Sequence, residues 1–247
     1  MKKIFLSFTM ISLSLVSFAQ TGEEIIAKCL ETMGGEKKMD GINSIRMTAK
    51  IDQMGMSIPL EMINLRNGKM IMKANFQGQE FVQMAFDGSS SWSTNFMTMK
   101  AEKNESEDTE NIKRQSLDFI MPIYQYKQKG YIIEKLADET IEGASCFKIK
   151  MTKKTSLSEG KEVPNIEFYY FDKDNFVPIV VEAEIPSGES KGMITQTLFS
   201  DYQEVDGIYF PFSITNKMKG SDGQAVMFTK VEINPVIEDK IFLFPGE

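Results

Sequence analysis

The chain of 247 residues contains no histidine, only two cysteines and a single tryptophan. The lack of histidine excludes Ser-His-Asp and Cys-His catalysis and histidine-ligated metal sites. The chain also lacks a glycine-rich phosphate loop of the usual spacing, and no apolar run after residue 20 is long enough to span a bilayer. The net charge of −7 at pH 7 disfavours nucleic acids and anionic membrane surfaces as partners.

The polar motifs that remain favour structural roles over catalysis. Residues 172–175, DKDN, resemble the start of a calcium loop, but strand residues flank them and no glutamate follows at the ligating distance, so a β-turn is favoured. Glu182 and Glu184 share one face of a strand, where a solvated outer surface is favoured over an acid–base pair. The sequence therefore predicts a protein that is not an enzyme and that has no metal or cofactor.

The first nineteen residues have the features of a secretory signal peptide. A basic pair precedes an apolar run over residues 4–18, and small residues lead up to a cleavage site between Ala19 and Gln20. No cysteine follows this site, so no lipid anchor is expected there. We expect residues 1–19 to be removed and residues 20–247 to form one exported domain, a usual length for an all-β fold.

The two cysteines give a weak signal about redox state. Cys29 falls on the apolar side of a helical pattern, whereas Cys146 alternates with lysines and falls on the polar side of a strand pattern. Because the two settings differ, two free thiols are favoured over a disulfide.

Helical patterns occur at two places in the chain. Thr21 and Glu24 have the spacing of a capping box, apolar residues follow at helical spacing, and a Gly-Gly pair at 34–35 ends the pattern. A second apolar stripe begins at Leu117, after a strongly polar interruption over residues 103–111. A proline at position 122 is expected to end this second helix at about residue 121.

From residue 43 onward the period of the apolar residues changes to two. Short alternating runs are joined by turn signals such as Asn67-Gly68, Asp87-Gly88 and Asp206-Gly207. We count about ten or eleven strands and no boundary that suggests a second domain. The sequence therefore predicts a mainly β (α+β) fold, in which a single curved antiparallel sheet has its concave face covered by the helices.

The residue types on the apolar face suggest what it holds. The chain has 18 methionines and 18 phenylalanines. Methionine is flexible and polarizable, so a methionine-rich face suits a cavity for a flexible acyl chain, although any single residue is more simply an ordinary core residue. The residues expected to line the concave face are Met47, Leu60, Met62, Met70, Met72, Met84, Val181 and Phe210. The residues expected beneath the helices, as a lid, are Ile26, Leu30, Leu117 and Met121.

Four segments share their pattern with a known protein family. They are KCLETMGGEKKMDGINSIRMTAKI, IEGASCFKIKM, IEFYYFDKDNFVPIVVE and DYQEVDGIYFPFSI. In these segments, and over essentially the whole chain after residue 20, the sequence resembles the LolA/LolB-type lipoprotein-sorting family of bacterial envelopes. Its cleavage site and its lysine-, methionine- and phenylalanine-rich style are similar to those of periplasmic proteins of Bacteroidetes.

This resemblance implies a half-open antiparallel barrel with a helical lid, whose concave face carries acyl chains of lipoproteins or other lipids toward the outer membrane. It also implies a periplasmic location, an inner-membrane complex that releases the cargo and an outer-membrane acceptor. Carriers of the family hold the lid closed with a strand arginine. Arg46 is in the first strand, but it falls on the face opposite Met47, so that role is not assigned to it.

Two other classes of function remain open. The same fold with a filled core would be a non-catalytic interaction or scaffold domain, which binds no lipid and presents a surface such as an edge strand. A hydrolase would need a catalytic set that the sequence does not provide. The carrier and the scaffold differ in whether the concave face is hollow, and the sequence pattern does not decide this.

Overall fold

The computed structural model describes residues 20–53 and 55–246; the predicted signal peptide, residues 1–19, lies outside the described residues. The helices are α1 (Gly22–Thr32), α2 (Glu36–Asp40) and α3 (Ser106–Gln115), with two 3-10 turns, η1 (Ser116–Asp118) and η2 (Asp239–Phe242). The strands are β1 (Ser44–Gln53), β2 (Met56–Leu65), β3 (Met70–Phe76), β4 (Gln79–Phe86), β5 (Ser91–Asn95), β6 (Lys100–Lys103), β7 (Ile132–Lys135), β8 (Glu139–Ile141), β9 (Ala144–Thr152), β10 (Ser156–Ser158), β11 (Lys161–Val163), β12 (Ile166–Asp172), β13 (Pro178–Glu184), β14 (Ile194–Val205), β15 (Ile208–Met218) and β16 (Gln224–Ile233).

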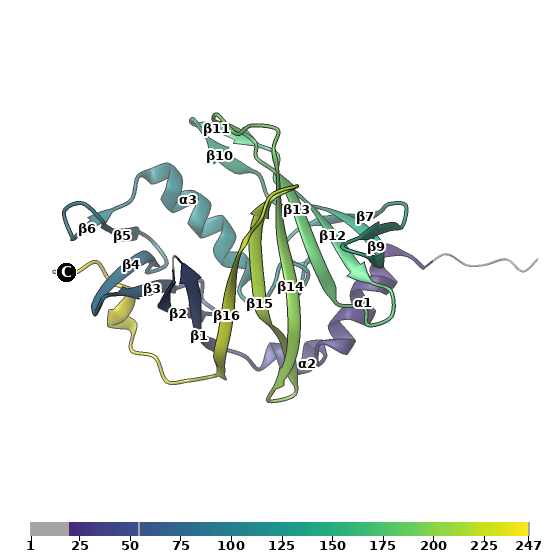
Figure 1. Ribbon diagram of the computed structural model, residues 1–247, viewed down its shortest axis with the longest axis horizontal. Coiled ribbons are helices and arrows are strands. Elements are labelled where there is room, and N and C mark those ends of the chain that lie inside the picture. The colour runs from purple at the N-terminus through teal and green to yellow at the C-terminus, as the bar shows by residue number, and fades with distance from the viewer. Residues whose placement is uncertain (1–19, 54, 247) are drawn as a thin grey trace, which may run out of the picture.

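Fourteen of these strands form one antiparallel sheet. Its order is β6-β5-β4-β3-β2-β1-β16-β15-β14-β13-β12-β9-β7, with β8 paired to β9 beside this path, while β10 and β11 form a separate hairpin. The sheet curls strongly, but its end strands β6 and β7 do not pair with each other within the described residues, so it is not closed (Figure 1). The predicted mainly β fold on one curved antiparallel sheet is confirmed.

The predicted number of strands, ten or eleven, is wrong, because the described residues form sixteen. The additional strands are short: β5 to β8, β10 and β11 have three to five residues each. A period of two cannot be recognised over so few residues, and these strands therefore escape a pattern-based count.

The first helix begins and ends as its sequence predicts. Thr21 Oγ1 accepts a hydrogen bond from the Glu24 backbone N–H at 3.2 Å, and the Glu24 carboxylate accepts one from the Thr21 N–H at 2.7 Å. After the helix, Gly34 has φ +118°, and a Cβ placed there would lie 2.4 Å from the Gly207 carbonyl oxygen. Only glycine fits this position, where the predicted Asp206-Gly207 hairpin between β14 and β15 docks against the end of α1.

The main core lies between the inner face of the sheet and a cover made by α1 and residues 116–131. We call residues 116–131 the lid segment. The cover buries Ile25, Ile26, Cys29 and Leu30 from α1 and Ile123, Tyr124, Tyr126 and Tyr131 from the lid segment. The sheet contributes the buried residues Ile149, Met151, Tyr169, Phe171, Ile208, Phe210, Phe212 and Phe228. The alternation after the Asp206-Gly207 turn thus predicted the inward face of β15 correctly.

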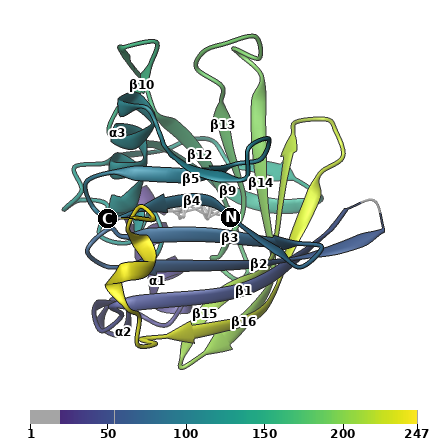
Figure 2. The same cartoon turned by 90° about the vertical axis from the view of Figure 1, so that its left-hand side faces the viewer.

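The outer face of the sheet carries two further apolar clusters. In one, the C-terminal segment covers β2 to β5, with Phe242 fully buried and its carbonyl oxygen accepting a hydrogen bond from the Trp92 indole N–H at 2.9 Å. Figure 2 shows this segment in yellow, lying across the outer side of the strands. The other cluster contains Cys146, Tyr170 and Val180. Outward-facing positions on these strands are therefore not always exposed to solvent.

Two expectations for the outer face are corrected by these clusters. Cys146 was expected at a polar position but is fully buried; both cysteines are nevertheless free thiols, as predicted. Glu182 was expected in solvent but is only 6% exposed. Its carboxylate accepts hydrogen bonds from the Tyr170 hydroxyl at 3.0 Å and the Gln196 amide at 2.8 Å, and it pairs with the Lys219 ammonium at 2.9 Å.

The second long helix lies earlier in the chain than predicted. α3 covers Ser106–Gln115 and begins inside the stretch interpreted as a polar interruption, residues 103–111. The expected helix around residues 117–121 is only a 3-10 turn followed by turns. α3 has no buried residue, so no apolar stripe marks it in the sequence. Leu117, expected beneath a helix, is 42% exposed, whereas Met121 packs against the main core.

Candidate binding face on the inside of the sheet

A row of methionines crosses the inner face of the sheet from β1 to β4. The cross-strand partners in this row are Met47, Met62, Met72 and Met84. Residues that are directly paired across antiparallel strands point to the same side of the sheet. Because Met47 and Met62 pack against the main core, that side is the inner face. We call these four residues the methionine row.

The side chains of the methionine row are half-buried, in contrast to the row beside it. Met70, two residues before Met72 on β3, shares their face and is also half-buried. The adjacent row of cross-strand partners, Ala49, Leu60, Ala74 and Phe81, is buried. The methionine row therefore offers flexible apolar side chains that are partly accessible, which is the property expected of a surface that repacks around a ligand.

The other predicted lining residues reach the same face but are more fully covered. Leu60 and Phe210 are buried in the main core, and Val181 packs against it. Ile26 and Leu30 are buried in that core from α1. Contact of any of these residues with a ligand stays a prediction.

The inner face thus has two parts that are covered differently. Across β12, β15 and β16 its aromatic side chains are buried beneath α1 and the lid segment; they are Tyr169, Phe171, Phe210, Phe212 and Phe228. Across β1 to β4 the methionine row is half-buried, and the polar helix α3 packs beside β4 and β5 (Figure 1). The protein's own side chains occupy the first part, so the second part is the more accessible one.

A buried ionic cluster joins the lid segment to the end of β9 and to β12. Asp118 Oδ1 accepts hydrogen bonds from the Lys129 ammonium and the Tyr131 hydroxyl, both at 3.0 Å. Asp118 Oδ2 lies 2.7 Å from Lys153 Nζ, and Lys153 also pairs with Glu167 at 3.0 Å. The side chains of Asp118, Lys129 and Lys153 are at most 10% exposed. Buried charges are costly unless paired, so this Asp118 cluster fixes the lid segment against the wall of the sheet.

The two lysines of the Asp118 cluster are held as cations to different degrees. Burial lowers the pKa of the Lys129 ammonium, despite the neighbouring Asp118 carboxylate. Burial also acts to lower the pKa of Lys153, but the charges of Glu167 and Asp118 outweigh it and the pKa is raised. Lys153 is the more firmly protonated of the two, because it contacts two carboxylates.

The other side of the lid segment contacts the turn between β2 and β3. Gly68 has φ +91°, and a Cβ placed there would lie 2.9 Å from Ser116 Oγ. The Arg66 guanidinium lies 5.3 Å from the centre of the Phe119 ring and donates hydrogen bonds to backbone carbonyl oxygens at the end of α2. The lid segment therefore spans from the β2–β3 turn to the wall formed by β9 and β12.

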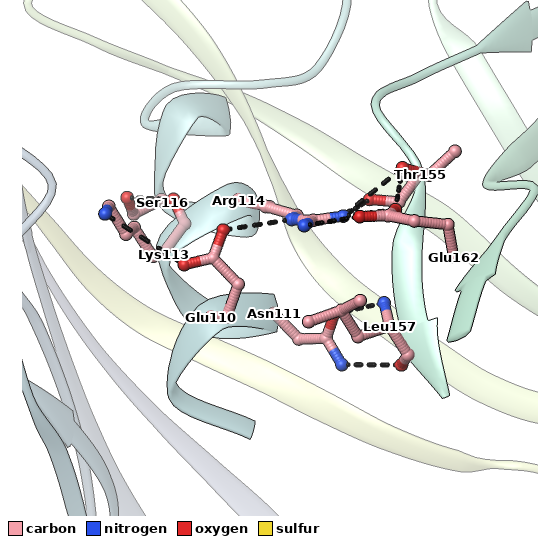
Figure 3. A network of polar contacts seen from close by, with 8 residues as sticks. All are labelled: Glu110, Asn111, Lys113, Arg114, Ser116, Thr155, Leu157 and Glu162. Atoms are coloured by element: carbon pink, nitrogen blue, oxygen red, sulfur yellow. Dashed lines mark hydrogen bonds and ion pairs between the residues drawn. The ribbon is translucent and has the colours of Figure 1, made fainter. Parts of the chain in front are cut away.

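Polar contacts attach α3 to the β10–β11 hairpin, and we call this set of contacts the α3 clamp (Figure 3). The Arg114 guanidinium donates to both oxygens of Glu162, at 2.7 and 2.9 Å, and to the Thr155 carbonyl oxygen at 2.7 Å. The Asn111 amide pairs with the Leu157 backbone, accepting at 2.8 Å and donating at 2.9 Å. Hydrogen bonds from Arg114 and Thr155 lower the pKa of the Glu162 carboxyl to about 2.

The opposite side of α3 is attached to β5, the strand next to the end strand β6. Thr109 on α3 and Ser91 on β5 share a hydrogen bond of 2.8 Å between their hydroxyls, and the Asn104 amide donates to Ser91 Oγ at 3.0 Å. α3 thus bridges β5 and the β10–β11 hairpin, across the opening between the two limbs of the sheet (Figure 1). These attachments are polar and α3 itself buries no residue, so they can break without exposing a buried apolar side chain of α3.

Two surface cavities flank the cover of the inner face. One, of about 630 Å³, lies between α1 and residues 125–128 and has four glutamates around Ile26 and Leu30. The other, of about 420 Å³, lies at the α3 clamp, and Leu117 contributes to its lining. Both are lined by a mixture of charged and apolar groups. Within residues 20–53 and 55–246, no group of three or more cysteine or acidic side chains is placed to hold a metal ion.

The residues that secure the cover were not identified from the sequence. Asp118 had one usable signal, a charge inside an otherwise apolar stretch, whereas Arg66 and Arg114 had none. The lid-closing role was not assigned to Arg46, because the alternation in its strand places it opposite Met47. The register of β1 with β2 and β16 places Arg46 on the outer face, where it forms an ion pair with Glu61 at 3.4 Å. The inner face presents mainly apolar side chains, and the polar groups of the Asp118 cluster beside it hold the cover in place.

Comparison with known proteins identifies the fold. No protein-family model matches the chain, and no curated protein matches it in sequence. A LolA superfamily protein from Nitrosomonas europaea is 14% identical, with a TM-score of 0.57 over 91% of this chain and 98% of that one. A putative outer membrane lipoprotein-sorting protein domain from Vibrio parahaemolyticus is 12% identical, with a TM-score of 0.51 over 88% and 97%.

A third similar structure carries a different family description. A DUF1329 family protein from Desulfovibrio piger is 11% identical, with a TM-score of 0.56 over 91% of this chain and 98% of that one. The similarity to these three structures confirms the resemblance found in the sequence at the level of the fold, which is LolA-like.

Within the described residues, no helix is both long and apolar enough to cross a membrane.

Proposed function

We propose that this protein is a periplasmic carrier that holds the acyl chains of lipoproteins, or of other lipids, against the methionine row. The observation that carries the proposal is the half-buried state of Met62, Met72 and Met84 on the inner face of an open sheet. The similarity of the fold to a LolA superfamily protein and to a lipoprotein-sorting protein domain supports it.

The physical requirement for such a carrier is an apolar host for the acyl chain. Each CH₂ group removed from water contributes about 0.8 kcal/mol, so a long acyl chain does not cross an aqueous compartment without comparable burial. A carrier must also release its cargo, which favours flexible methionines over a rigid, closely fitted pocket. The methionine row supports the proposal because it offers apolar side chains that are flexible and half-buried.

Loading requires part of the cover to move. The α3 clamp is the element we expect to move first, because α3 buries no residue and is attached by polar groups. The lid segment is expected to move less readily, because its aromatic side chains are buried and the Asp118 cluster fixes it. A cargo chain is therefore expected to enter beside α3 and to lie along β1 to β4.

The route of the cargo is also part of the proposal. Export by the signal peptide at residues 1–19, cleavage before Gln20 and a folded domain over residues 20–247 would place the carrier in the periplasm. There it would receive cargo from an inner-membrane complex and deliver it to an outer-membrane acceptor, without catalysing a reaction.

The proposal is tested by native mass spectrometry of the protein, purified from a periplasm without detergent. Any bound mass is then extracted with solvent and identified. The expected result is a bound species that extracts as a lipid. If the protein is free of ligand, and stays so after incubation with an acylated peptide, the carrier function is wrong.

One observation favours a second candidate function, an interaction or scaffold domain with a filled core. The aromatic part of the inner face is already filled by the protein's own side chains, among them Tyr124, Tyr126 and Phe171. If this filling extended over the whole face in solution, no lipid would bind and the protein would act through its surface. The ligand-free outcome of the mass measurement would favour this function.

A further inference from the structure

The hairpin between β5 and β6 ends in an exposed apolar tip. Phe96 is 65% exposed, Met97 is 96% exposed and Met99 is 37% exposed. We call these three residues the β5–β6 tip. In Figure 2 the tips of the β1–β2, β3–β4 and β5–β6 hairpins lie toward the same edge of the molecule, and the first of these exposes Met56. A contiguous group of exposed apolar side chains, unlike a single one, marks a candidate contact surface.

The backbone of the β5–β6 tip is satisfied from within the hairpin. Asn95 Oδ1 accepts hydrogen bonds from the N–H groups of Met97 at 2.9 Å and Thr98 at 3.1 Å, and the Asn95 carbonyl oxygen accepts one from the Met99 N–H at 2.8 Å. Moving backbone donors out of water is costly unless they are already hydrogen-bonded. The tip can therefore enter an apolar medium without leaving these donors unpaired.

The β5–β6 tip is continuous with the candidate binding face. The Phe96 ring lies 5.2 Å from the Phe81 ring, centre to centre. Phe81 is paired with Ala74 on the inner face, in the row next to the methionine row. An apolar path therefore runs from the exposed tip, through the two aromatic rings, to the inner face of β3 and β4.

We propose that the β5–β6 tip is a membrane contact, which inserts into the interfacial region of a lipid bilayer and leads an acyl chain from there to the methionine row. A bilayer fits this tip because three flexible, unlike side chains protrude together, and a fluid apolar medium accepts them without a complementary shape. The contact is apolar in nature, since the protein has a net charge of −7 and Lys100, directly after the tip, lies two residues before Glu102.

The inference deepens the proposed function and rests on it for the direction of transfer, but the membrane contact can be tested separately. The test is flotation of the purified protein with vesicles of phosphatidylcholine, in low and in high salt. The variants are Met97→Asp, whose side chain is almost fully exposed, and Phe96→Asp. The control is Val236→Asp, a substitution of the same kind at a position that is 94% exposed in the C-terminal segment.

The expected result is vesicle binding that is insensitive to salt and about tenfold or more weaker for Met97→Asp and Phe96→Asp, with no change for Val236→Asp. Equal binding of the wild type and Met97→Asp, or no binding of the wild type, would overturn the membrane contact and leave a protein as the occupant of the tip. Binding of a water-soluble acylated peptide is measured on the same samples. If the tip is needed for vesicle binding but no peptide binds, the carrier function fails and the membrane contact stands.

Discussion

The Arg114 guanidinium on α3 and the Glu162 carboxylate on β11 form a two-point ion pair, with N···O distances of 2.7 and 2.9 Å. This pair attaches a helix that buries no residue to a hairpin outside the main sheet. A helix of this kind is positioned by its partners and not by an apolar face. The position of α3 across the opening of the sheet therefore depends on a few identifiable charges.

The first prediction concerns the acidity of Glu162. Its carboxyl pKa is lowered from 4.5 to about 2, chiefly by the hydrogen bonds from Arg114. Because the folded pKa is the lower one, the stabilisation by this pair is fully present above pH 4.5 and is lost as the pH falls toward 2. Carbon-detected NMR titration is expected to show the lowered pKa in the wild type and an ordinary one in Arg114→Gln. Arg46→Gln, which removes an arginine elsewhere, should leave Glu162 unchanged, and a pKa near 4.5 in the wild type would contradict the clamp.

The second prediction concerns the Asp118 cluster. Asp118→Asn removes one carboxylate from between Lys129 and Lys153 and leaves a buried charge without its partner. The free energy of unfolding is expected to fall by about 3–5 kcal/mol, measured by urea denaturation. Asp138→Asn is the matched control, since Asp138 pairs with two lysines at a partly exposed site, and a loss below about 1 kcal/mol is expected there. Equal effects of the two variants would show that the Asp118 cluster does not secure the lid segment.

The third prediction concerns the methionine row. The double variant Met72→Asp, Met84→Asp places two charges where the acyl chain is expected, and affinity for an acylated peptide should fall at least about tenfold. The matched control is Met193→Asp, Met227→Asp, which changes the same residue type at two exposed positions. Isothermal titration calorimetry checks both variants. Unchanged affinity in the first variant would mean that the binding face is assigned wrongly.

The fourth prediction concerns the thiols. Burial raises the pKa of Cys29 to about 12, and burial is also the main cause of a raised pKa at Cys146. Neither thiol should react with Ellman's reagent in the folded protein at pH 8, and both should react in urea. Since the folded pKa of Cys29 is the higher one, stability is expected to decrease as the pH rises from about 9 toward 12. Rapid reaction of one thiol in the folded protein would contradict its burial.

Local sequence signals predicted the right elements where the packing of a segment followed a simple period. The capping box at Thr21 and the turn at Asp206-Gly207 depend on neighbouring residues only, and both formed as predicted. The alternation in β15 placed Phe210 and Phe212 inside because that strand has one buried face. Such features can be derived without knowledge of the rest of the chain.

The features that were missed depend on contacts between distant parts of the chain. Cys146 and Glu182 are buried because β9 and β12 to β14 have a packed outer face as well as an inner one. α3 has no apolar stripe because it is held by Glu162 and other polar groups more than forty residues away. The Asp118 cluster likewise joins residues from η1, from the position directly after β9 and from β12, which no spacing in the sequence brings together.

The most direct test of the central claim is to locate the acyl chain on the protein. An acylated peptide with a photoreactive diazirine in its chain is bound, irradiated and mapped by mass spectrometry of the digested protein. We predict crosslinks to β1–β4 peptides that contain Met62, Met72 and Met84. Crosslinks confined to exposed methionines such as Met193, or an absence of crosslinks in a sample with proven peptide excess, would contradict a carrier that uses the inner face.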